Sequence, residues 1–377
     1  MWSFQTEGAV WGTPLIDGAT VYIGSDDGNL YAIHAVTGQL RWKFATEGLV
    51  RSQPATAAGL IYLTSDDGFM YAVDAQAGQQ VWRTDIGNFS ESEKRENPGV
   101  SPDPTGFDYL QSAPVFFEQQ VYAGSADGNV YALAADTGKL MWTFRTAKKI
   151  RATPSVTDGT VYIGSWDGTV YALDASTGLP RWQTPIGGAI QTTALVSNGL
   201  VYTASRKASL VALDAQTGSK RWEYDYGPNA WVESSPRLAG NVLYIGSSGN
   251  RYVLGLDSQT GELLTSYQGS AFFWSSPLIV GDTLFIGAEG FTPTADIGGL
   301  YRFKLPTALD AGRRRPMELD WLLALPQTLM PDGNWAGVAS SPVLSGDVVY
   351  FGALDGKLYA VGIGSGCKCR RRIAWHP

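Results

Sequence analysis

Residues 172–182 have the sequence Ala-Leu-Asp-Ala-Ser-Thr-Gly-Leu-Pro-Arg-Trp. The same pattern, Ala-x-Asp-x-x-Thr-Gly-x-x-x-Trp, returns in close copies that end at Trp42, Trp82, Trp142 and Trp222. Most copies lie about 40 residues apart, an interval typical of repeat proteins, in which one unit cannot bury its apolar face without a neighbour. The sequence therefore predicts a series of similar units that pack side by side.

A second marker gives the number of units. A Ser/Thr-x-Pro-like stretch ends in Pro, or once in Ala, and a small residue closes an apolar run ten residues later. The eight pairs are Pro14 and Gly24, Pro54 and Thr64, Pro114 and Gly124, Pro154 and Gly164, Ala194 and Ala204, Pro236 and Gly246, Pro277 and Gly287, and Pro342 and Gly352. Because the offset is constant while the distance between units varies, each pair marks one packed element. We therefore expect eight units.

Within a unit the pattern is that of β-strands. In residues 161–173, alternating β-branched and aromatic residues flank Asp167-Gly168, which predicts a hairpin with a type I′ turn and positive φ at both central residues. The same turn is expected at Asp27-Gly28, Asp67-Gly68, Asp127-Gly128 and Asp355-Gly356. No segment has sustained helical periodicity. Four strands per unit and eight units predict an all-β protein, an eight-bladed β-propeller of four-stranded antiparallel blades.

The ends of the chain predict how the ring closes. Trp2 precedes Pro14 by twelve residues, as Trp42 precedes Pro54. Residues 2–6 should thus be the outer strand of the eighth blade, whose other strands lie in residues 338–363, with residues 373–375 as a competitor. We expect one propeller domain over residues 1–363, with insertions at 85–108 and 288–300 and a seventh blade stretched to about residue 335. Residues 364–377 should be a disordered tail or a remnant of an expression vector.

The repeated phrase resembles the tryptophan-docking motif of the quinoprotein-like (PQQ-repeat) eight-bladed propellers, over residues 2–363. It does not resemble the WD40 repeat, because the paired Gly-His and Trp-Asp signature is missing. The resemblance implies that Trp42, Trp82, Trp142, Trp182 and Trp222 pack against the neighbouring blade. Two units depart from the motif: Thr265 stands where Trp is expected, and Trp321 is the expected equivalent in the stretched seventh unit.

Composition narrows the environment and the partners. The net charge is −7, and basic residues are scattered except at 313–315 and 370–372, which argues against nucleic acid. No apolar run approaches the roughly 20 residues that a membrane span needs. We expect no signal peptide, because the first strand begins at Trp2, and the chain would then be either a mature form or a cytoplasmic protein. The resemblance implies the former, a mature extracytoplasmic protein of the periplasm or cell envelope, and we expect a monomer. Cys367 and Cys369 lie in the tail and are interpreted as part of it, with metal binding or redox chemistry as the alternative.

Propeller topology predicts where a site would lie. The residue three before each marker starts the innermost strand at the mouth of the central channel, on the face where the hairpin turns emerge. These positions vary while the strands repeat, so individual function can be carried there. The entry positions are Trp11, Arg51, Gln111, Arg151, Gln191, Glu233, Trp274 and Ala339, and the turns add Asp26, Asp66, Trp166, Arg206 and Glu289. Both insertions should lie on this face. The alternatives are a ligand or partner site and a polar, wet mouth filled by aromatic side chains.

The leading hypothesis is a non-catalytic scaffold that binds a protein, a peptide or a small anionic ligand at the channel mouth. It resembles the outer-membrane assembly lipoproteins of the family more than the dehydrogenases. No cofactor, metal or catalytic residue is expected. A few aromatic and Arg anchors would carry the affinity; with those already named we include Trp231.

The alternative is a dehydrogenase that uses pyrroloquinoline quinone and Ca²⁺ to oxidise alcohols or sugars. Such a cofactor needs aromatic stacking, arginines, hard oxygen ligands and a carboxylate base. Fragments of this set are present in Trp11, Trp274, Arg51, Arg151 and Glu233. The family's dehydrogenases are much longer and carry an adjacent Cys-Cys pair, which this sequence lacks.

Hydrolysis and other acid–base reactions find little support in the sequence. The chain has two histidines, His34 and His376, and His34 takes the place of the Asp of the repeat, so we expect it to be structural. Paired carboxylates remain open as a catalytic arrangement. Whether the chain is an enzyme is therefore uncertain, with the balance against it.

Overall fold

The computed structural model describes residues 1–87, 111–227, 230–290, 297–306, 315–325 and 337–363. The chain divides into two compact units. The N-terminal unit comprises Phe4–Ala194, and the C-terminal unit comprises Leu195–Pro377 together with Met1–Ser3. The described residues contain β-strands and turns but no helix, so there is no helix among them that could cross a membrane.

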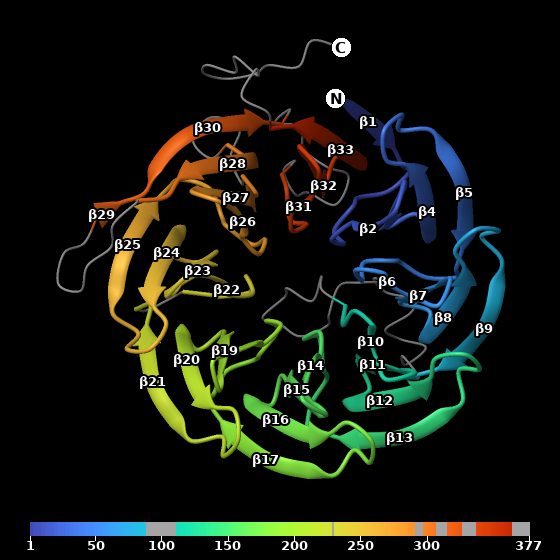
Figure 1. Ribbon diagram of the computed structural model, residues 1–377, viewed down its shortest axis with the longest axis horizontal. Helices are drawn as coiled ribbons and strands as arrows, with labels where there is room; N and C mark the ends of the chain where they lie inside the picture. The colour runs from blue at the N-terminus through green and yellow to red at the C-terminus, as the bar shows by residue number, and fades with distance from the viewer. Residues whose placement is uncertain (88–110, 228–229, 291–296, 307–314, 326–336, 364–377) are drawn as a thin grey trace. The chain divides into compact units, whose positions relative to one another are not determined.

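The N-terminal unit holds four sheets of four strands, coloured blue to green in Figure 1. The first blade consists of β2 (Leu15–Asp17), β3 (Thr20–Gly24), β4 (Asn29–His34) and β5 (Leu40–Ala45), and the second of β6 (Ala55–Ala57), β7 (Leu60–Thr64), β8 (Phe69–Asp74) and β9 (Gln80–Asp85). The third consists of β10 (Val115–Phe117), β11 (Gln120–Gly124), β12 (Asn129–Ala134) and β13 (Leu140–Arg145), and the fourth of β14 (Ser155–Thr157), β15 (Thr160–Gly164), β16 (Thr169–Asp174) and β17 (Pro180–Pro185).

The C-terminal unit holds the other four sheets. The fifth blade consists of β18 (Leu195–Ser197), β19 (Leu200–Ser205), β20 (Ser209–Asp214) and β21 (Lys220–Asp225), and the sixth of β22 (Arg237–Ala239), β23 (Val242–Gly246), β24 (Tyr252–Asp257), β25 (Leu263–Gln268) and β29 (Arg315–Pro316). The seventh consists of β26 (Leu278–Val280), β27 (Thr283–Ala288), β28 (Gly299–Lys304) and β30 (Glu318–Ala324), and the eighth of β31 (Val343–Ser345), β32 (Val348–Gly352), β33 (Lys357–Gly362) and β1 (Trp2–Gln5).

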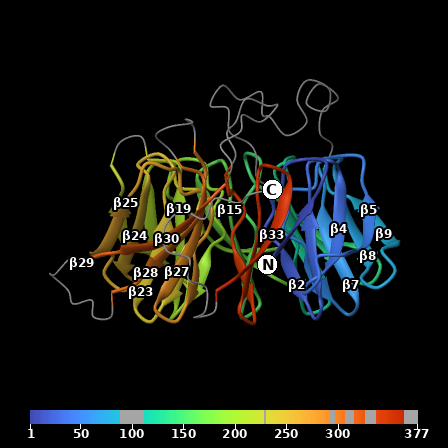
Figure 2. The same ribbon diagram turned by 90° about the horizontal axis from the view of Figure 1, so that it is seen from above.

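The predicted fold class, an all-β eight-bladed propeller, is confirmed by these eight sheets. Strands consecutive along a blade pair antiparallel, as in the ladder of β15, β16 and β17. Strand β1 pairs with β33, so the N-terminal strand completes the eighth blade as expected. One sheet departs from the prediction. In the sixth blade, β29 adds a fifth strand that pairs parallel with β25 and leads into β30 (Figures 1 and 2).

The hairpin turn has a different geometry from the one predicted. Gly28 has a φ of 82°, but Asp27 is not among the residues with positive φ, so the type I′ expectation was wrong. The loop has three residues: Gly28 N–H donates to Ser25 O at 3.1 Å, and Ser25 N–H donates to Asn29 O at 3.0 Å. This is the hairpin in which only the last loop residue needs the left-handed region, which is why Gly stands there.

The Asp of the turn is explained by its hydrogen bonds. Asp27 Oδ1 accepts from Asn29 N at 2.9 Å, and Oδ2 accepts from Tyr31 Oη at 2.7 Å and from Glu7 N at 2.9 Å. A carboxylate thus holds both its own turn and the strand that follows. The same link from Asp to the Tyr four residues later occurs at Asp67, Asp127, Asp167 and Asp355. An acceptor with two oxygens is needed here, which a smaller polar residue cannot supply.

The constant ten-residue offset also has a physical cause. The Ser two residues before the marker bonds the small residue that closes the apolar strand: Ser112 Oγ accepts from Gly124 N at 2.8 Å, and Ser234 Oγ accepts from Gly246 N at 3.0 Å. The small residue leaves room for the next entry segment, because a Cβ on Gly124 would collide with the Ile150 side chain. An insertion between the two residues would break this buried bond, so their spacing cannot change.

The repeated Trp residues link consecutive blades. Trp42, Trp82, Trp142 and Trp222 each donate Nε1–H to a carbonyl of the next blade, on Ala75, Ala135, Ala175 and Ser258, at 2.8–3.1 Å. Each ring also packs on the Gly of the next Thr-Gly or Ala-Gly turn; at Gly178 an added Cβ would lie 2.6 Å from the Trp142 ring. Trp182 tilts against Tyr162 with ring centroids 5.9 Å apart. The repeated phrase therefore supplies both a Trp that packs on the next blade and a Gly turn that receives the Trp of the preceding blade.

The two departures from the Trp pattern lie at the equivalent strand positions. Trp142 pairs with Ala132 just before a bulge, and Trp321 pairs with Arg302 in the same way, so Trp321 is the seventh blade's equivalent. In the sixth blade, Thr265 pairs with Gly255 at this place. There the outer strand is itself covered, because β29 pairs with it through Arg315.

Candidate functional site

In each unit the hairpin turns lie beside the segments that enter the innermost strands. In the N-terminal unit, Asp66 N–H donates to Leu49 O at 3.0 Å, and Trp166 N–H donates to Lys149 O at 3.0 Å. In the C-terminal unit, Ser248 N–H donates to Trp231 O at 3.0 Å. These backbone bonds bring the side chains of turns and entry segments to the same end of the blades, as the topology predicts.

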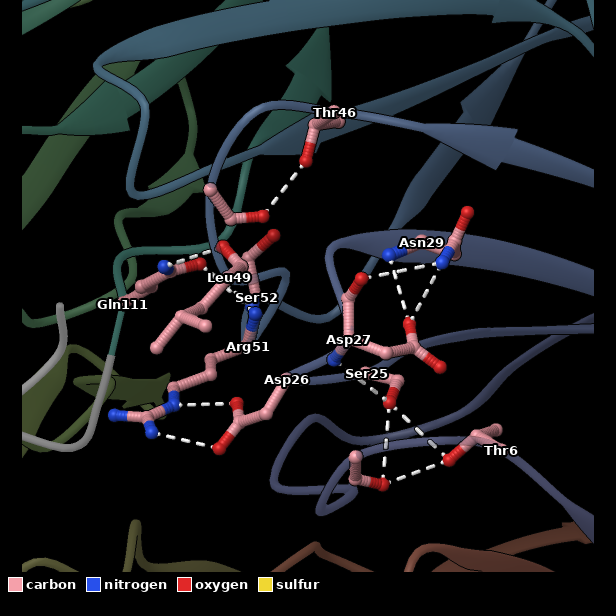
Figure 3. Close-up of polar contacts among 12 residues, drawn as sticks. Thr6, Ser25, Asp26, Asp27, Asn29, Thr46, Leu49, Arg51, Ser52 and Gln111 are labelled. Atoms are coloured by element: carbon pink, nitrogen blue, oxygen red, sulfur yellow. Dashed lines mark hydrogen bonds and ion pairs between the residues drawn. The ribbon is translucent and has the colours of Figure 1, made fainter.

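The first cluster of the N-terminal unit is built on Arg51. Its Nε and Nη2 lie 2.7 Å from Asp26 Oδ1 and Oδ2, a two-pronged ion pair between the turn of the first blade and the entry segment of the second (Figure 3). The guanidinium carbon also lies 5.4 Å from the centre of the Trp11 ring. The Arg51 side chain is only 7% exposed. Its charge is therefore directed to a partner within the protein.

Gln111 fastens the same region through its amide. Oε1 accepts the backbone N–H of Arg51 at 3.0 Å and of Ser52 at 3.1 Å, and Nε2 donates to Leu49 O at 3.0 Å (Figure 3). The amide takes the place of a backbone partner for the segment that enters the second blade. Gln111 thus has a structural explanation that does not require a ligand.

Further along this unit, Lys149 covers Trp166. The Lys149 Nζ lies 4.0 Å from the centre of the Trp166 ring, within the range of a cation–π contact. Trp166 is buried, and Gln191 is buried as well, whereas Arg151 is partly exposed. Of these three predicted site residues, Arg151 has the side chain that solvent reaches.

The second cluster lies in the C-terminal unit and is built on Glu233. Its Oε1 is 3.1 Å from Arg206 Nε, and its Oε2 accepts from Ser248 Oγ at 2.9 Å. Arg206 also lies over Trp231, with its guanidinium carbon 5.1 Å from the ring centre. The Glu233 and Arg206 side chains are 2% and 10% exposed. Burial raises the pKa of Glu233, although the charge of Arg206 and the bond from Ser248 act in the opposite direction.

Two more predicted residues of this unit surround a short backbone pairing. Glu289 is buried and exchanges backbone hydrogen bonds with Phe272, at 2.9 and 3.0 Å, and it also bridges to Gly337. Arg251 lies over the Phe272 ring at 4.5 Å. Trp274, two residues on, is partly exposed. Glu289 is therefore part of the framework, and Trp274 has a side chain that a partner can reach.

The ion pairs themselves were missed by sequence reasoning. Asp26 and Arg51 are 25 residues apart, and Arg206 and Glu233 are 27 apart, each a turn of one blade and the entry segment of the next. The two pairs are equivalent in place and opposite in polarity. The signal that could have found them is a pair of opposite charges, one in the turn of a blade and the other 25 or 27 residues later in the entry segment of the next blade. Lys149 and Ser248 were also missed, and they carry no signal of their own in the repeat.

His34 has the structural role expected. Its Nδ1 accepts the N–H groups of Val36 and Thr37 at 3.2 Å, as Asp174 Oδ1 accepts those of Ser176 and Thr177 in the fourth blade. The His ring thus substitutes for the usual Asp of this turn. Over the residues that the structure describes, no group of three or more His, Cys, Asp and Glu side chains could hold a metal ion.

Several predictions fall outside the described residues. Most of the 85–108 insertion, the centre of the 288–300 insertion and most of the stretched part of the seventh blade belong to this group. So does the tail, with Cys367, Cys369 and the competitor strand at 373–375.

Comparisons with known proteins give a family match for this chain and several solved structures that share its fold. The family model described as outer membrane protein assembly factor BamB matches residues 1–92, 90–191 and 126–290. BamB from Moraxella catarrhalis is 22% identical with a TM-score of 0.63, over 76% of this chain and 84% of that structure. The computationally designed Ika8 protein is 19% identical with a TM-score of 0.69, over 95% and 98%. The comparison with curated proteins gave no match.

A dehydrogenase shares the fold as well. Quinohemoprotein alcohol dehydrogenase ADHIIG from Pseudomonas putida HK5 is 15% identical with a TM-score of 0.73, over the whole of this chain and 77% of that structure. At such identities the solved structures establish the fold that is shared. They leave the activity to be argued from the residues.

Proposed function

Because this chain belongs to the family of the outer membrane protein assembly factor BamB, we propose that it is a non-catalytic scaffold that holds a protein partner during the assembly of outer-membrane proteins. The family match also confirms the resemblance predicted from the repeat. We further propose that the protein acts outside the cytoplasm, in the periplasm or cell envelope, and as a monomer.

The observation that carries this proposal is that the buried charged side chains pair with each other within the protein. Arg51 and Arg206, two of the three arginines expected at the channel mouth, are each paired with a carboxylate of the neighbouring blade. These pairs tie turn to entry segment and so fix the position of the loops. A rigid set of loops favours binding, because little conformational entropy is lost when a partner docks.

The exposed members of the predicted site supply the contacts. Trp231, Trp274 and Arg151 are all partly exposed, and Trp and Arg are the residue types that most often dominate the energy of a protein interface. Trp231 is already held by Arg206, which limits its rotamers before binding. We therefore assign partner contacts to Arg151 in the N-terminal unit and, separately, to Trp231 and Trp274 in the C-terminal unit, and we assign the framework to the buried side chains.

A dehydrogenase that uses pyrroloquinoline quinone and Ca²⁺ fits the described residues less well. The cofactor's carboxylates would need cations, and Arg51, one of the two arginines expected in this role, already binds a carboxylate of the protein. The described residues also bring together no group of three acidic, His or Cys side chains that would suit a metal ion. The described residues thus favour the scaffold over this dehydrogenase.

The experiment is complementation of a bacterial strain that lacks BamB. The chain, exported to the periplasm, should restore the level of folded outer-membrane proteins. Trp274→Ala and Arg151→Ala should lower that level without changing the melting temperature. Arg181→Ala is the control, because Arg181 is exposed but pairs with Asp174 at the opposite end of its blade.

Failure of the wild-type chain to complement, with normal export and folding, would count against the assembly role. Full complementation by the Trp274 and Arg151 variants would instead remove these residues from the contact surface. Titration with pyrroloquinoline quinone and Ca²⁺, followed by tryptophan fluorescence and thermal shift, tests the alternative. Saturable quenching with a raised melting temperature would favour the dehydrogenase.

A further inference from the structure

A chain of contacts links Trp231 in the entry segment of the sixth blade to Trp274 in that of the seventh. The carbonyl of Trp231 accepts from the N–H and the Oγ of Ser248, both at 3.0 Å, and Ser248 O accepts from Arg251 N–H at 3.3 Å. The Arg251 guanidinium carbon lies 4.5 Å from the centre of the Phe272 ring. Phe272 O in turn accepts from Trp274 N–H at 3.2 Å. These contacts join four partly exposed residues, here called the aromatic strip: Trp231, Arg251, Phe272 and Trp274.

The backbone of Arg251 has a conformation that does not favour an arginine. Its φ is 59°, in the left-handed region, where the Cβ of an L-residue crowds the following carbonyl. Arg251 is the last residue of its hairpin turn, and the equivalent residues Gly28, Gly168 and Gly356 have φ of 82°, 83° and 79°. An arginine here costs folding free energy that a glycine would not. The turn therefore gives no reason for an arginine, whereas its side chain has a defined place over Phe272.

The loops around the aromatic strip carry a positive charge. Between β19 and β20, β21 and β22, β23 and β24, and β25 and β26, the sequence has three basic residues, Arg206, Lys207 and Arg251, and one acidic residue, Glu233. Arg206 and Glu233 pair with each other. Lys207 is exposed and Arg251 is partly exposed, so solvent meets positive charge here although the whole chain carries a net charge of −7. Such a surface favours a partner segment that is acidic.

The contact between Arg251 and Phe272 is compatible with carboxylate binding. A ring takes up one face of a planar guanidinium, whereas the N–H donors lie in its plane. The same side chain can therefore stack on a ring and form two parallel N–H···O bonds with a carboxylate. The aromatic rings on either side of this charge suit apolar or aromatic side chains of the same partner.

We propose that the aromatic strip binds an extended peptide segment, one face of which carries an acidic side chain between two aromatic ones. Side chains two residues apart in an extended chain lie on the same face. This order matches the strip, in which Arg251 lies between Trp231 and Trp274 along the chain of contacts. The proposal rests on the proposed function, because it specifies the chemistry of the partner segment that meets the two tryptophans.

The test is isothermal titration of the whole chain with the peptide Phe-Ser-Glu-Ser-Phe, capped at both ends. Two matched peptides carry Gln in place of Glu, or Ala in place of both Phe. The Glu peptide should bind one site, and each matched peptide should bind weaker by roughly tenfold or more. The affinity for the Glu peptide should fall as the salt concentration rises, whereas that for the Gln peptide should change little.

Three variants separate charge, strain and fold. Arg251→Gly should weaken binding of the Glu peptide by roughly tenfold or more, while the melting temperature stays equal or rises because the backbone strain is relieved. Ala208→Gly is the matched control, because Ala208 ends the turn of the fifth blade with a φ of 66° and lies outside the strip. It should bind the Glu peptide as the wild type does. Arg251→Gln keeps a side chain in the strained turn without the charge, so it should bind the Glu and Gln peptides equally.

Wild-type affinity of Arg251→Gly for the Glu peptide would overturn the proposal, as would equal binding of the Glu and Gln peptides by the wild type. A marked fall in melting temperature in Arg251→Gly would also count against it, because the arginine would then support the fold. Peptide binding by a chain that fails to complement the strain lacking BamB would keep the strip and remove the assembly role. Complementation without peptide binding would remove the strip and keep that role.

Discussion

Glu233 and Arg206 form an ion pair at 3.1 Å that joins the sixth blade to the turn of the fifth, with both side chains almost removed from solvent. Ser248 Oγ binds the second carboxylate oxygen at 2.9 Å. Such a pair contributes little compared with the cost of breaking it, because removal of one partner leaves the other charged and buried. The pair is therefore best tested by comparing single and double substitutions.

Arg206→Met should lower the free energy of unfolding by about 3 kcal/mol, the lower end of the range for breaking a buried pair, because Glu233 is then buried without its counter-charge. The double variant Arg206→Met, Glu233→Gln should recover most of this loss. Urea unfolding of the wild type, both single variants and the double variant gives the coupling energy. Simple additivity of the two single effects would contradict a direct interaction between the residues.

The raised pKa of Glu233 predicts how pH acts on stability. Below its ordinary value of 4.5, the carboxyl is protonated in both the folded and the unfolded chain. Between 4.5 and the raised pKa the folded chain holds a proton that the unfolded chain has lost, so the contribution of Glu233 to stability falls as pH rises through this window. The difference in unfolding free energy between wild type and Glu233→Gln should therefore decrease from pH 4.5 towards neutrality. A difference that grows with pH would mean that the pKa is lowered.

Gly178→Ala should be more destabilising than backbone strain alone explains. Its φ is 73°, and a Cβ would lie 2.6 Å from the Trp142 ring. Gly59→Ala is the matched control, because its φ is 79° and nothing lies within 4 Å of an added Cβ. We expect roughly 1 kcal/mol of strain in the control, and about 1–3 kcal/mol more at Gly178 from displacement of the ring. Equal losses in urea unfolding would show that the Trp ring moves aside freely.

Thr265→Trp should destabilise the protein, although the repeat consensus favours Trp at this position. Thr265 is 1% exposed, and its Cγ2 would already lie 2.5 Å from a Cβ on Gly255. Its strand is also covered by β29, and among the described residues no other sheet has a fifth strand. Forcing a larger side chain into such a place costs typically 1–3 kcal/mol. A rise in the urea midpoint for this variant would mean that the sixth blade has kept the space for a Trp.

The repeat explains why the fold could be predicted so fully from the sequence. The Trp residues, the Ser residues and the Gly residues each serve the same contact in several blades, so one local rule applies many times. The turn type was wrong because an Asp-Gly pair suits two kinds of hairpin. Asp27 favours the three-residue loop over the two-residue turn, because its carboxylate accepts hydrogen bonds from Asn29, Tyr31 and Glu7.

The candidate site was less predictable because its residues escape the repeat. Topology placed Arg51, Glu233 and Trp274 at one end of the blades, but it could not say which charges would meet. The pairing of Arg51 with Asp26 depends on contact between consecutive blades. A single sequence indicates that contact only through the opposite charges of two residues that are 25 positions apart. Strand β29 was also missed, because two residues give no periodicity.

The pairing of β1 with β33 sets an order of events during synthesis. The first five blades each draw their strands from one continuous stretch, so each can form once that stretch has left the ribosome. Strand β1 is made first, yet its partner begins only at Lys357. The eighth blade must therefore be completed after β33 has been translated, while β1 waits unpaired. A chaperone that shields an extended N-terminal segment would act at this stage, and loss of the segment would leave the β33 edge open to strands of other molecules.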